Sequence, residues 1–544
     1  MRTQRIPVTT AADPEAAARG SLTSGPYAQN AMYSTYPDGT PYVTQRASID
    51  ITLPASIGSI TSQRGRGIYF WDQAGNSTDE AVYYVIDDTV YRGGPTGALA
   101  QTISSGVDPV TFVQLGDKLM ILDQENNDAW YIDDQLPETL LPIDGEGGGL
   151  ANHPVNIPNV QIAGGGTSLG GYIFIMDTDG NIYNSNVDDA LTWTAADVIK
   201  AEREADTGVY LAKQNDNVVA FGTSSVEFFY NAGNPNGSPL NVRPDVFYRT
   251  GAFDAKSVTD LGDIVYYVGS ERVGKLGLFA LEQLKPMKVS TDLIDSALNA
   301  VVRSKDAMLI SGTTIGSHRL TFLTIATQGA TTDPYVPTAT WVFDGAVGVW
   351  SAYTTTVADV TGHFPVIGVA NRGGTGQEEP RILFLSGDVG LVTVHGVARD
   401  TSGAEDYFVG GVDQSNFEGA GIDKYMEDDD AYVLPIEFAN SSDIDFQLDL
   451  KPYDEDSMSY KFCHKVSLVG TTDSGTSTAG EIDISYSDDH YRTFSTPRQL
   501  DTLMHRALAR WGKFKRRVWR IAYSGTDRLK IEALEMKTGK SRNA

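Results

Sequence analysis

The chain of 544 residues has a single cysteine, Cys463, and no apolar run long enough to span a bilayer. One cysteine excludes an internal disulfide, so stability must come from packing, and the protein tolerates a reducing compartment while it folds. A membrane-spanning helix needs about 18 or more consecutive apolar residues, and the first thirty residues lack the apolar core, about 7–15 residues long, of a signal peptide. We therefore expect no membrane-spanning segment and no secretion by that route.

Residue patterns that indicate catalysis or metal binding are also missing. There is no His-Glu-x-x-His, and with 70 acidic residues paired carboxylates arise by chance. The acidic run Glu427–Asp430 lacks the alternating ligands and the glycine of a calcium loop, so we interpret it as a solvated or partner-facing loop. We predict no catalytic residues, no metal and no cofactor. The histidines are scattered: His153, His318, His363, His395, His464, His490 and His505.

Positive charge is scarce except near the C-terminus. The net charge is -28, which argues against tight, sequence-independent binding to DNA, since such binding draws its affinity from cationic groups. Residues 501–544 nevertheless contain twelve Lys or Arg and four Asp or Glu, a net of +8, so the rest of the chain carries -36. The function of this basic segment is the main question that the composition raises.

Short apolar runs rich in Val, Ile, Tyr and Phe recur along the chain. Their length and composition are typical of strands, and their starts are 45 to 62 residues apart, near the period of a propeller blade. They predict a mainly β fold with few short helices, in which a β-propeller-like core has six or seven sheets. The runs are "GIYFW" from Gly67, "KLMIL" from Lys118, "YIFIM" from Tyr172, "NVVAF" from Asn217, "DIVYYV" from Asp263, "LTFLT" from Leu320 and "ILFLS" from Ile382.

Sequences typical of turns recur between these apolar runs. Leu-Gly-Asp precedes two of the apolar runs, at Leu115 and Leu261, as a turn into a buried strand requires. A short helix is expected within Ser290–Ser304, where apolar residues recur at helical intervals behind a Ser/Thr/Asp cap. Five dipeptides are type I′ hairpin candidates: Asp38-Gly39, Asp144-Gly145, Asp179-Gly180, Asn236-Gly237 and Asp344-Gly345.

A change of composition near residue 400 predicts the domain organisation. The sequence becomes polar, Gly-rich and acidic there, and strand-like segments then precede the basic end. We expect an N-terminal arm or partial sheet at 1–59, a β-propeller-like domain at 60–400, and a smaller β domain with a basic C-terminal segment at 401–544.

The segment "SDDHYRTF" resembles an Asp-box, the hairpin turn Ser-x-Asp-x-Gly-x-Thr-Trp. Ser487, Asp489, Thr493 and Phe494 match the pattern, and Tyr491 stands where glycine is usual. The Asp side chain of such a turn bonds back to the turn backbone, which makes it a folding device. Sialidases contain Asp-boxes and so do many non-enzymes, so we interpret these residues as a structural turn.

Two parts of the chain resemble the packaged-DNA stabilisation family of short-tailed bacteriophages, the tail hub or nozzle proteins. The first is "NVVAFGTSSVEFFYNAGNPNGSP" from Asn217, followed by the segment from Phe247 with its "YVGSERVG" hairpin and by "VST" from Val289 before a helix. The second is the C-terminal end: an "SDD" turn, basic residues around Trp511-Gly512, Arg520 in a strand, and "LKIEALEM" from Leu529.

The resemblance implies a structural virion protein of the phage tail, made in the host cytoplasm and not an enzyme. Such proteins form a homo-oligomeric ring, typically a hexamer, below the portal and adaptor rings, and other tail proteins such as a fibre, spike or needle are further partners. The ring retains packaged DNA and conducts it during ejection, so double-stranded DNA would pass without sequence-specific binding. An acidic lumen would suit this conduit, because like charge keeps phosphates from adhering to the wall.

Two other functions fit the sequence. The Asp-box-like turn and the 26 Tyr also suit a propeller-type glycan-binding or glycan-degrading tail protein, and a cellular propeller scaffold is the other alternative.

The basic stretch from Arg506 to Gly525 is expected to form strands with a bend or bulge at Gly512, because "VWRIAY" is β-branched and aromatic. It suits a solvated face, an interface with an acidic neighbouring subunit or adaptor ring, or a contact with DNA. The residues assigned to the partner or ring interface are Lys513, Lys515, Arg516, Arg517 and Arg520.

Overall fold

The computed structural model is mainly β, with one α-helix in the part that it describes. No helix of that part is long and apolar enough to cross a membrane. The structure describes residues 2–8, 28–46, 48–52, 65–71, 81–86, 88–93, 100–106, 108–145, 149–271, 275–301, 308–315, 318–328, 335–357, 360–364, 366–370, 381–389, 392–401, 405–406, 442–443, 445–454, 459–472, 481–500, 508–525 and 529–540.

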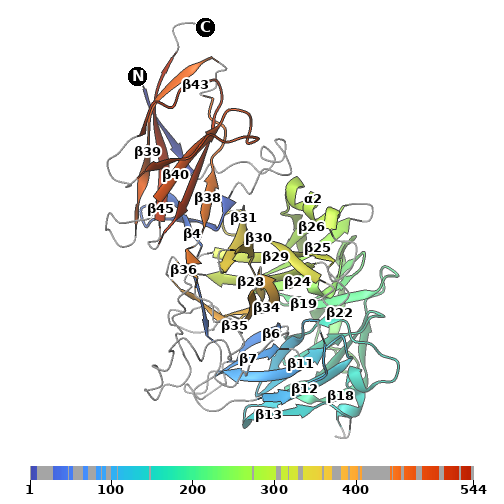
Figure 1. Ribbon diagram of the computed structural model, residues 1–544. Helices are drawn as coiled ribbons and strands as arrows, with labels where there is room; N and C mark the ends of the chain where they lie inside the picture. Colours follow the sequence, from blue (N-terminus) through green and yellow to red (C-terminus); the bar gives the residue numbers. More distant parts are fainter. Residues whose placement is uncertain are drawn as a thin grey trace, which may run out of the picture.

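Five sheets follow one another between Gly65 and Lys288 (Figure 1). The first has β6 (Gly65–Trp71), β7 (Ala81–Ile86), β8 (Thr89–Gly93) and β9 (Ala100–Thr102). The second has β10 (Thr111–Leu115), β11 (Lys118–Asp123), β12 (Asp128–Asp133) and β13 (Leu136–Pro142), and the third has β15 (Thr167–Leu169), β16 (Tyr172–Met176), β17 (Asn181–Asn186) and β18 (Asp189–Lys200).

The fourth sheet has β14 (Gly164–Gly165), β19 (Gly208–Gln214), β20 (Asn217–Gly222), β21 (Val226–Asn231) and β22 (Leu240–Tyr248). The fifth has β23 (Thr250–Ala252), β24 (Val258–Leu261), β25 (Ile264–Glu271), β26 (Gly277–Glu282) and β27 (Lys285–Lys288). Single-turn 3₁₀ helices precede β14 and β24: η2 (Leu150–Asn152), η3 (Pro154–Asn156) and η4 (Ala255–Ser257).

Two further sheets contain strands from other parts of the chain. In one, β28 (Met308–Ile315), β29 (His318–Gln328), β30 (Tyr335–Asp344), β31 (Val349–Val357) and β32 (Val360–His363) belong to a ten-stranded sheet. In the other, β33 (Val366–Ala370), β34 (Arg381–Val389) and β35 (Val392–Thr401) are completed by β5 (Ser48–Thr52), which pairs with β35.

These seven sheets form a closed ring. Strand β24 of the fifth sheet contacts β28, β28 contacts β33, and β33 contacts β6 of the first sheet. Because β5 precedes the first sheet in the chain but belongs to the last, the ring is closed by hydrogen bonds between segments far apart in sequence. The predicted β-propeller-like core is confirmed, with five consecutive blades and two additional sheets.

The hydrophobic core of the propeller lies between successive sheets. Trp71 and Tyr83 of the first sheet pack with Leu119 and Trp130 of the second, and similar clusters join the second to the third, the third to the fourth, and the fourth to the fifth. Each inner strand is therefore buried on both faces, as in β20, where all six residues are buried. This explains why such runs are continuously apolar rather than alternating.

The helix α2 (Asp292–Val301) lies where it was expected, within Ser290–Ser304. Ile294 and Leu298, one helical turn apart, are both buried and face the core. Asp292 and Asp295 lie in the first turn, where negative charge interacts favourably with the helix dipole and stabilises the helix.

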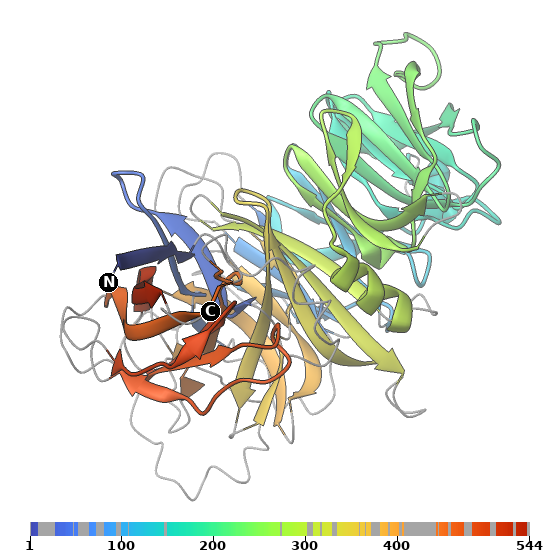
Figure 2. The same cartoon turned by 90° about the horizontal axis from the view of Figure 1, so that it is seen from above.

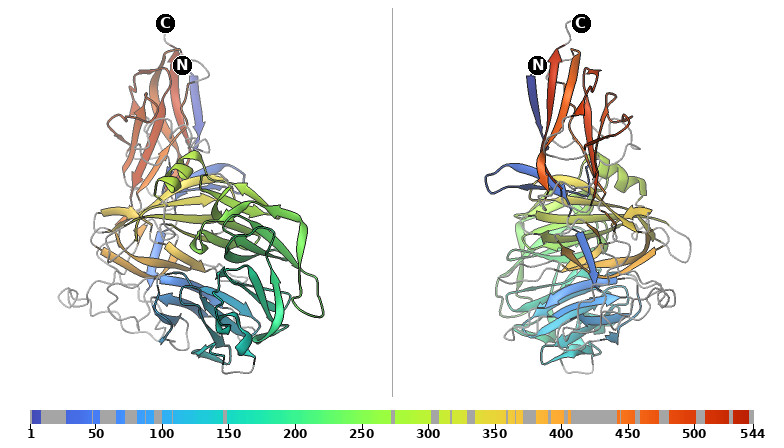
Figure 3. Two further views of the ribbon diagram at one scale, coloured as in Figure 1. Left: turned by 90° about the vertical axis from the view of Figure 1, so that its right-hand side faces the viewer. Right: turned by 60° about the vertical axis from the view of Figure 1, so that its left-hand side comes forward.

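Segments from both ends of the chain form the sheets at the other end of the molecule (Figures 1 and 3). One sheet has β3 (Ala31–Thr35), β4 (Pro41–Gln45), β45 (Leu529–Lys540), β39 (Lys461–Thr472) and β42 (Leu508–Ala509), with β1 (Arg2–Pro7) beside β45 and β43 (Lys513–Phe514) beside β39. The ten-stranded sheet continues from β31 through β2 (Ala28–Gln29), β38 (Phe446–Asp449), β44 (Val518–Ser524) and β40 (Glu481–Ser487) to β41 (Arg498–Leu500).

A small two-stranded sheet pairs β36 (Glu405–Asp406) with β37 (Ser442–Asp443). In Figure 2, which looks down on the molecule, the blue N-terminal strands lie beside the orange and red C-terminal strands. We call the two sheets that contain β38–β45 the C-terminal sheets. The proposed domain boundaries at 59/60 and 400/401 stay a prediction.

The Leu-Gly-Asp turns form as expected, but the type I′ assignments are wrong. Both tripeptides connect paired strands, β10 to β11 and β24 to β25. A type I′ turn needs positive φ at both central residues, and none of the five Asp or Asn residues of the Asp-Gly and Asn-Gly pairs has it. Positive φ is found only at the second residue of four pairs, Gly39, Gly145, Gly180 and Gly237.

Candidate functional site

The basic stretch forms strands, as predicted, and Gly512 is its bend. Strands β42, β43 and β44 cover most of the segment, and Gly512 between β42 and β43 has a φ of +78°, in the left-handed region that favours glycine. The carbonyl of Gly512 accepts a hydrogen bond from the Cys463 amide, which ties this bend to β39.

Arg517 points into the protein. Its side chain is 1% exposed and donates two hydrogen bonds of 2.7 Å to the carboxylate of Asp488. A third hydrogen bond of 2.6 Å reaches the Trp511 carbonyl, and the guanidinium lies 3.7 Å from the centre of the Tyr486 ring. Such fork-shaped pairing and stacking use most of the donors of an arginine.

Arg520 also has its partners within the chain. It donates two hydrogen bonds, of 2.6 and 2.8 Å, to Asp449, which lies on the neighbouring strand β38. Its guanidinium stacks 3.6 Å from the centre of the Phe494 ring. Arg517 and Arg520 therefore stabilise the C-terminal sheets, and their charges are paired with acids of the same chain.

Lys513 and Lys515 face solvent. Both are exposed, and their ammonium groups lie 4.0 and 4.8 Å from the centre of the Tyr460 ring. Arg516 is half-buried, with its Nε 3.9 Å from a carboxylate oxygen of Asp454. Of the five predicted interface residues, the two lysines present their charge most openly.

The Asp-box-like residues form one turn after β40. The Asp489 carboxylate accepts hydrogen bonds from the Thr493 amide (2.9 Å) and hydroxyl (2.6 Å), and the Ser487 hydroxyl donates to it at 2.7 Å. Although partial burial opposes it, these bonds lower the pKa of Asp489 to about 2. Tyr491, which replaces the usual glycine, has a φ of +68°.

A similar turn in the propeller was missed by the sequence reasoning. Between β16 and β17, the Asp177 carboxylate accepts hydrogen bonds from the amides of Asp179 and Asn181, the side chain of Asn181 and the hydroxyl of Tyr183. The signal in the sequence was an Asp two residues before an Asp-Gly pair, which is the usual spacing of an Asx turn.

Residues of four sheets of the propeller meet around one small cavity. The Lys256 ammonium, from the fifth sheet, lies 2.6 Å from a carboxylate oxygen of Asp108, which precedes the second sheet. Beside this pair Gly164 packs so closely that an added Cβ would overlap with the Cβ of Ala255. The cavity there has a volume of about 80 Å³, enough for only a few water molecules. Its lining comes from four sheets and includes Pro109, Gly164, Tyr210, Lys256 and Leu309.

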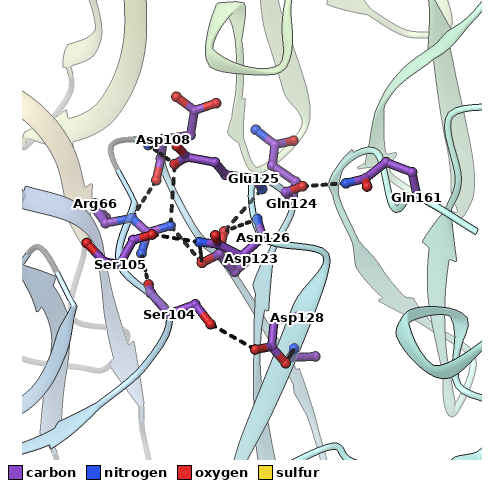
Figure 4. Close-up of polar contacts among 11 residues, drawn as sticks. Arg66, Ser104, Ser105, Asp108, Asp123, Gln124, Glu125, Asn126, Asp128 and Gln161 are labelled. Atoms are coloured by element: carbon purple, nitrogen blue, oxygen red, sulfur yellow. Dashed lines mark hydrogen bonds and ion pairs between the residues drawn. The ribbon is translucent and has the colours of Figure 1, made fainter.

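A buried arginine joins the first sheet to the second (Figure 4). Arg66, on β6, lies 2.8 Å from Asp123 on β11, and neither side chain is exposed. Arg66 also donates to the carbonyls of Ser104 and Asp108, in the connection between the first two sheets. Gly106 packs closely against this site, because an added Cβ would lie 2.5 Å from the Glu125 carboxylate and 2.8 Å from the guanidinium of Arg66, so these side chains would have to shift.

Acidic side chains are also notable at two other places in the propeller. Asp117, Asp133 and Asp134 have carboxylate oxygens within 4.8 Å of one another, but Lys118 lies 2.7 Å from Asp117 and 3.0 Å from Asp133. On the inner strand β24, burial raises the pKa of Asp260 to about 7, and hydrogen bonds from the backbone oppose this. The acidic run Glu427–Asp430 lies outside the described residues.

The chain is similar to one protein family and, in fold, to several solved structures. The model of the family described as "Bacteriophage P22 Gp10, beta-propeller" matches residues 59–374. No curated protein matches.

The solved structures include BamB from Moraxella catarrhalis (12% identity, TM-score 0.31, 62% of this chain and 82% of that one) and the N-terminal domain of Nup159 (9%, 0.34, 68% and 97%). A third is Raptor from Chaetomium thermophilum (11%, 0.36, 65% and 29%). Likenesses with TM-scores below 0.5 carry no conclusion about function.

Proposed function

The chain belongs to the bacteriophage P22 Gp10 β-propeller family, and from that premise we propose that it forms the ring-shaped tail hub, or nozzle, of a phage tail. Proteins of this family are virion components that stabilise packaged DNA and are generally not enzymes. The proposed ring is a hexamer that lies below the portal and adaptor rings, retains the packaged DNA and conducts it during ejection. A fibre, spike or needle protein is the proposed partner on its other side, and the host cytoplasm is the proposed place of synthesis.

The observation that carries this proposal is the tight packing where four sheets of the propeller meet. The cavity there, lined by Gly164 and Lys256 among others, has a volume of about 80 Å³ and cannot admit double-stranded DNA, whose major groove alone is about 12 Å wide. We therefore propose that DNA retained or conducted by this protein passes beside the propeller and not through it. A channel enclosed by several copies of the chain meets this need, and a closed cyclic ring is the usual way to build one.

The charge of the chain supports a conduit that does not bind DNA. A net charge of -28 gives the protein a surface that repels phosphate groups. We propose that acidic side chains line the lumen, so that the duplex slides without sequence-specific contacts. The propeller suits the wall of such a channel, because its blades leave only short sheet edges open to unwanted pairing.

The test is electron microscopy of virions that carry a label at the C-terminus of this protein, with a nuclease assay on the same particles. The expected result is a sixfold ring at the tail end of the portal and adaptor, and loss of nuclease protection of the genome when the protein is missing. A label on fibres or dispersed over the tail, with the genome still protected without the protein, would contradict the proposal.

The Asp-box-like turn gives the glycan-binding alternative no support, because its side chains serve the turn itself. The Asp-box-like residues Ser487, Asp489 and Thr493 satisfy one another within the turn, and Phe494 stacks on Arg520. A polysaccharide-degradation assay on the purified protein separates the two functions, since the hub is expected to leave the polymer intact.

A further inference from the structure

A surface at the distal end of the C-terminal sheets combines exposed aromatic rings with exposed lysine side chains. Tyr460, just before β39, and Phe462, on β39, are each 40% exposed, and His464 follows Phe462 on the same face of the strand. In the register of β39 with β43, Phe462 lies opposite Lys513. We call Tyr460, Phe462, Lys513 and Lys515 the aromatic-basic face.

Among the described residues, the neighbours of the two rings leave both partly exposed. On the other side of β39, Phe462 lies opposite Gly539 of β45, which has no side chain to cover the ring. Tyr460 is flanked by the two lysines, whose ammonium groups lie 4.0 and 4.8 Å from its centre. Aromatic rings are enriched in protein interfaces, and charged side chains such as these lysines suit the polar rim around them.

We propose that the aromatic-basic face docks onto an acidic surface of a second copy of this chain, and that this contact joins neighbours in the ring. The inference rests on the proposed function, since it assumes that the ring exists. Residues 501–544 carry a net charge of +8 and the rest of the chain carries -36. The basic segment of one copy can therefore attract acidic side chains of a neighbouring copy. A contact between two different surfaces of one chain is head-to-tail, the type that closes into a ring.

The aromatic rings favour a protein partner over DNA. Of the five cations predicted for an interface, Arg517 and Arg520 are paired inside the chain, which leaves chiefly Lys513 and Lys515 as open charges on this face. Two lysines give a duplex few phosphate contacts, and the phosphate backbone offers no apolar surface to cover Phe462. An acidic protein surface can pair with the lysines and can also cover the aromatic rings.

The experiment compares self-association of the full chain and its variants by sedimentation velocity at several salt concentrations. Tyr460→Ala with Phe462→Ala is expected to weaken association at least about tenfold at every salt concentration. Lys513→Glu with Lys515→Glu is expected to do so at low salt and less at high salt, because the lost attraction is screened. Circular dichroism verifies the fold of each variant.

Matched control variants change the same chemistry elsewhere on the surface. Val198→Ala with Met287→Ala removes apolar side chains that are 38% and 44% exposed, and Lys200→Glu with Lys285→Glu reverses two exposed lysines of the propeller. The controls are expected to associate like the original chain.

The outcomes separate the two proposals. If the original chain stays monomeric at all concentrations and no ring is found in virions, the proposed function fails and this inference fails with it. If rings form but the aromatic-basic variants form them equally well, only this inference is overturned. Loss of binding to a 20-base-pair duplex probe with unchanged self-association would also overturn it and assign the face to DNA.

Discussion

The propeller and the C-terminal sheets each bury an arginine, but they pair it differently. In the propeller, Arg66 and Asp123 are both wholly buried, and they join the first sheet to the second. In the C-terminal sheets, Arg517 is buried while its partner Asp488 remains 40% exposed, and aromatic rings surround the guanidinium. In the propeller, both members of the ion pair are shielded from water. In the C-terminal sheets, Asp488 stays in contact with water while Arg517 is buried among aromatic rings.

The largest predicted difference follows from this contrast. Arg66→Met should lower the free energy of unfolding by about 3–5 kcal/mol, because it leaves the Asp123 carboxylate buried without its counterion. Arg517→Met should cost less, about 2–3 kcal/mol, because Asp488 can turn to water and the loss is that of hydrogen bonds and ring stacking. Urea denaturation of both variants measures the difference, and equal losses would remove the distinction between the two pairs.

The next prediction concerns which region the N-terminal segment stabilises. Val8, beyond β1, is fully buried in the cluster that includes Leu534 and Met536 of β45. Val8→Ala should cost about 2 kcal/mol and speed hydrogen exchange in Leu529–Lys540 more than in Lys118–Asp123. Val85→Ala, which truncates an equally buried valine of the first propeller sheet, should show the reverse preference. Uniform acceleration in both segments would show that the two regions open together.

A smaller effect is expected at the two Asp turns. Asp177 is 2% exposed and accepts four hydrogen bonds, so Asp177→Ala should cost about 2–3 kcal/mol by leaving buried donors without a partner. Asp489→Ala should cost about 1 kcal/mol, since water replaces the lost acceptor in the more exposed turn. Thermal denaturation compares them, and a larger loss at Asp489 would contradict the ranking.

The smallest effect is the acid dependence of the Asp489 turn. The folded pKa of about 2 lies below the ordinary value of 3.8, so the unfolded chain binds the proton more readily, and the stabilisation is present above pH 4 and is lost as the pH falls toward 2. Because the group is near solvent, we expect on the order of 1 kcal/mol. Asp489→Asn should flatten the pH dependence of unfolding in this window relative to the original chain. An unchanged slope would show that other carboxyl groups dominate it.

The propeller could be predicted from the sequence because its blades are local. The strands of each of the first five sheets are consecutive or nearly so, so that apolar runs such as those from Lys118 and Tyr172 mark each blade. The helix within Ser290–Ser304 could be predicted for the same reason, since its cap and its buried residues are close in sequence.

The C-terminal sheets and their arginines could not be predicted in this way. Strands β1, β3 and β4 join a sheet with β39 and β45, and no local pattern specifies partners so distant. The acids that pair with Arg517 and Arg520 lie 29 and 71 residues earlier in the chain. The sequence alone therefore predicted that these arginines share one exposed surface with the lysines. Only the structure separates the inward arginines from the outward lysines.

The pairing of β1 with β45 has a consequence for synthesis of the protein. More than 500 residues separate Pro7 from Leu529, and a ribosome adds roughly 5–20 residues per second. The N-terminal strand therefore waits roughly 25–100 s before its partner is made, and β5 likewise waits for β35. During that time their edges lack their final partners, so premature pairing between nascent chains is the hazard that this architecture carries. Synthesis of β45, and not the completion of any single blade, is therefore the step that allows the subunit to reach its final fold.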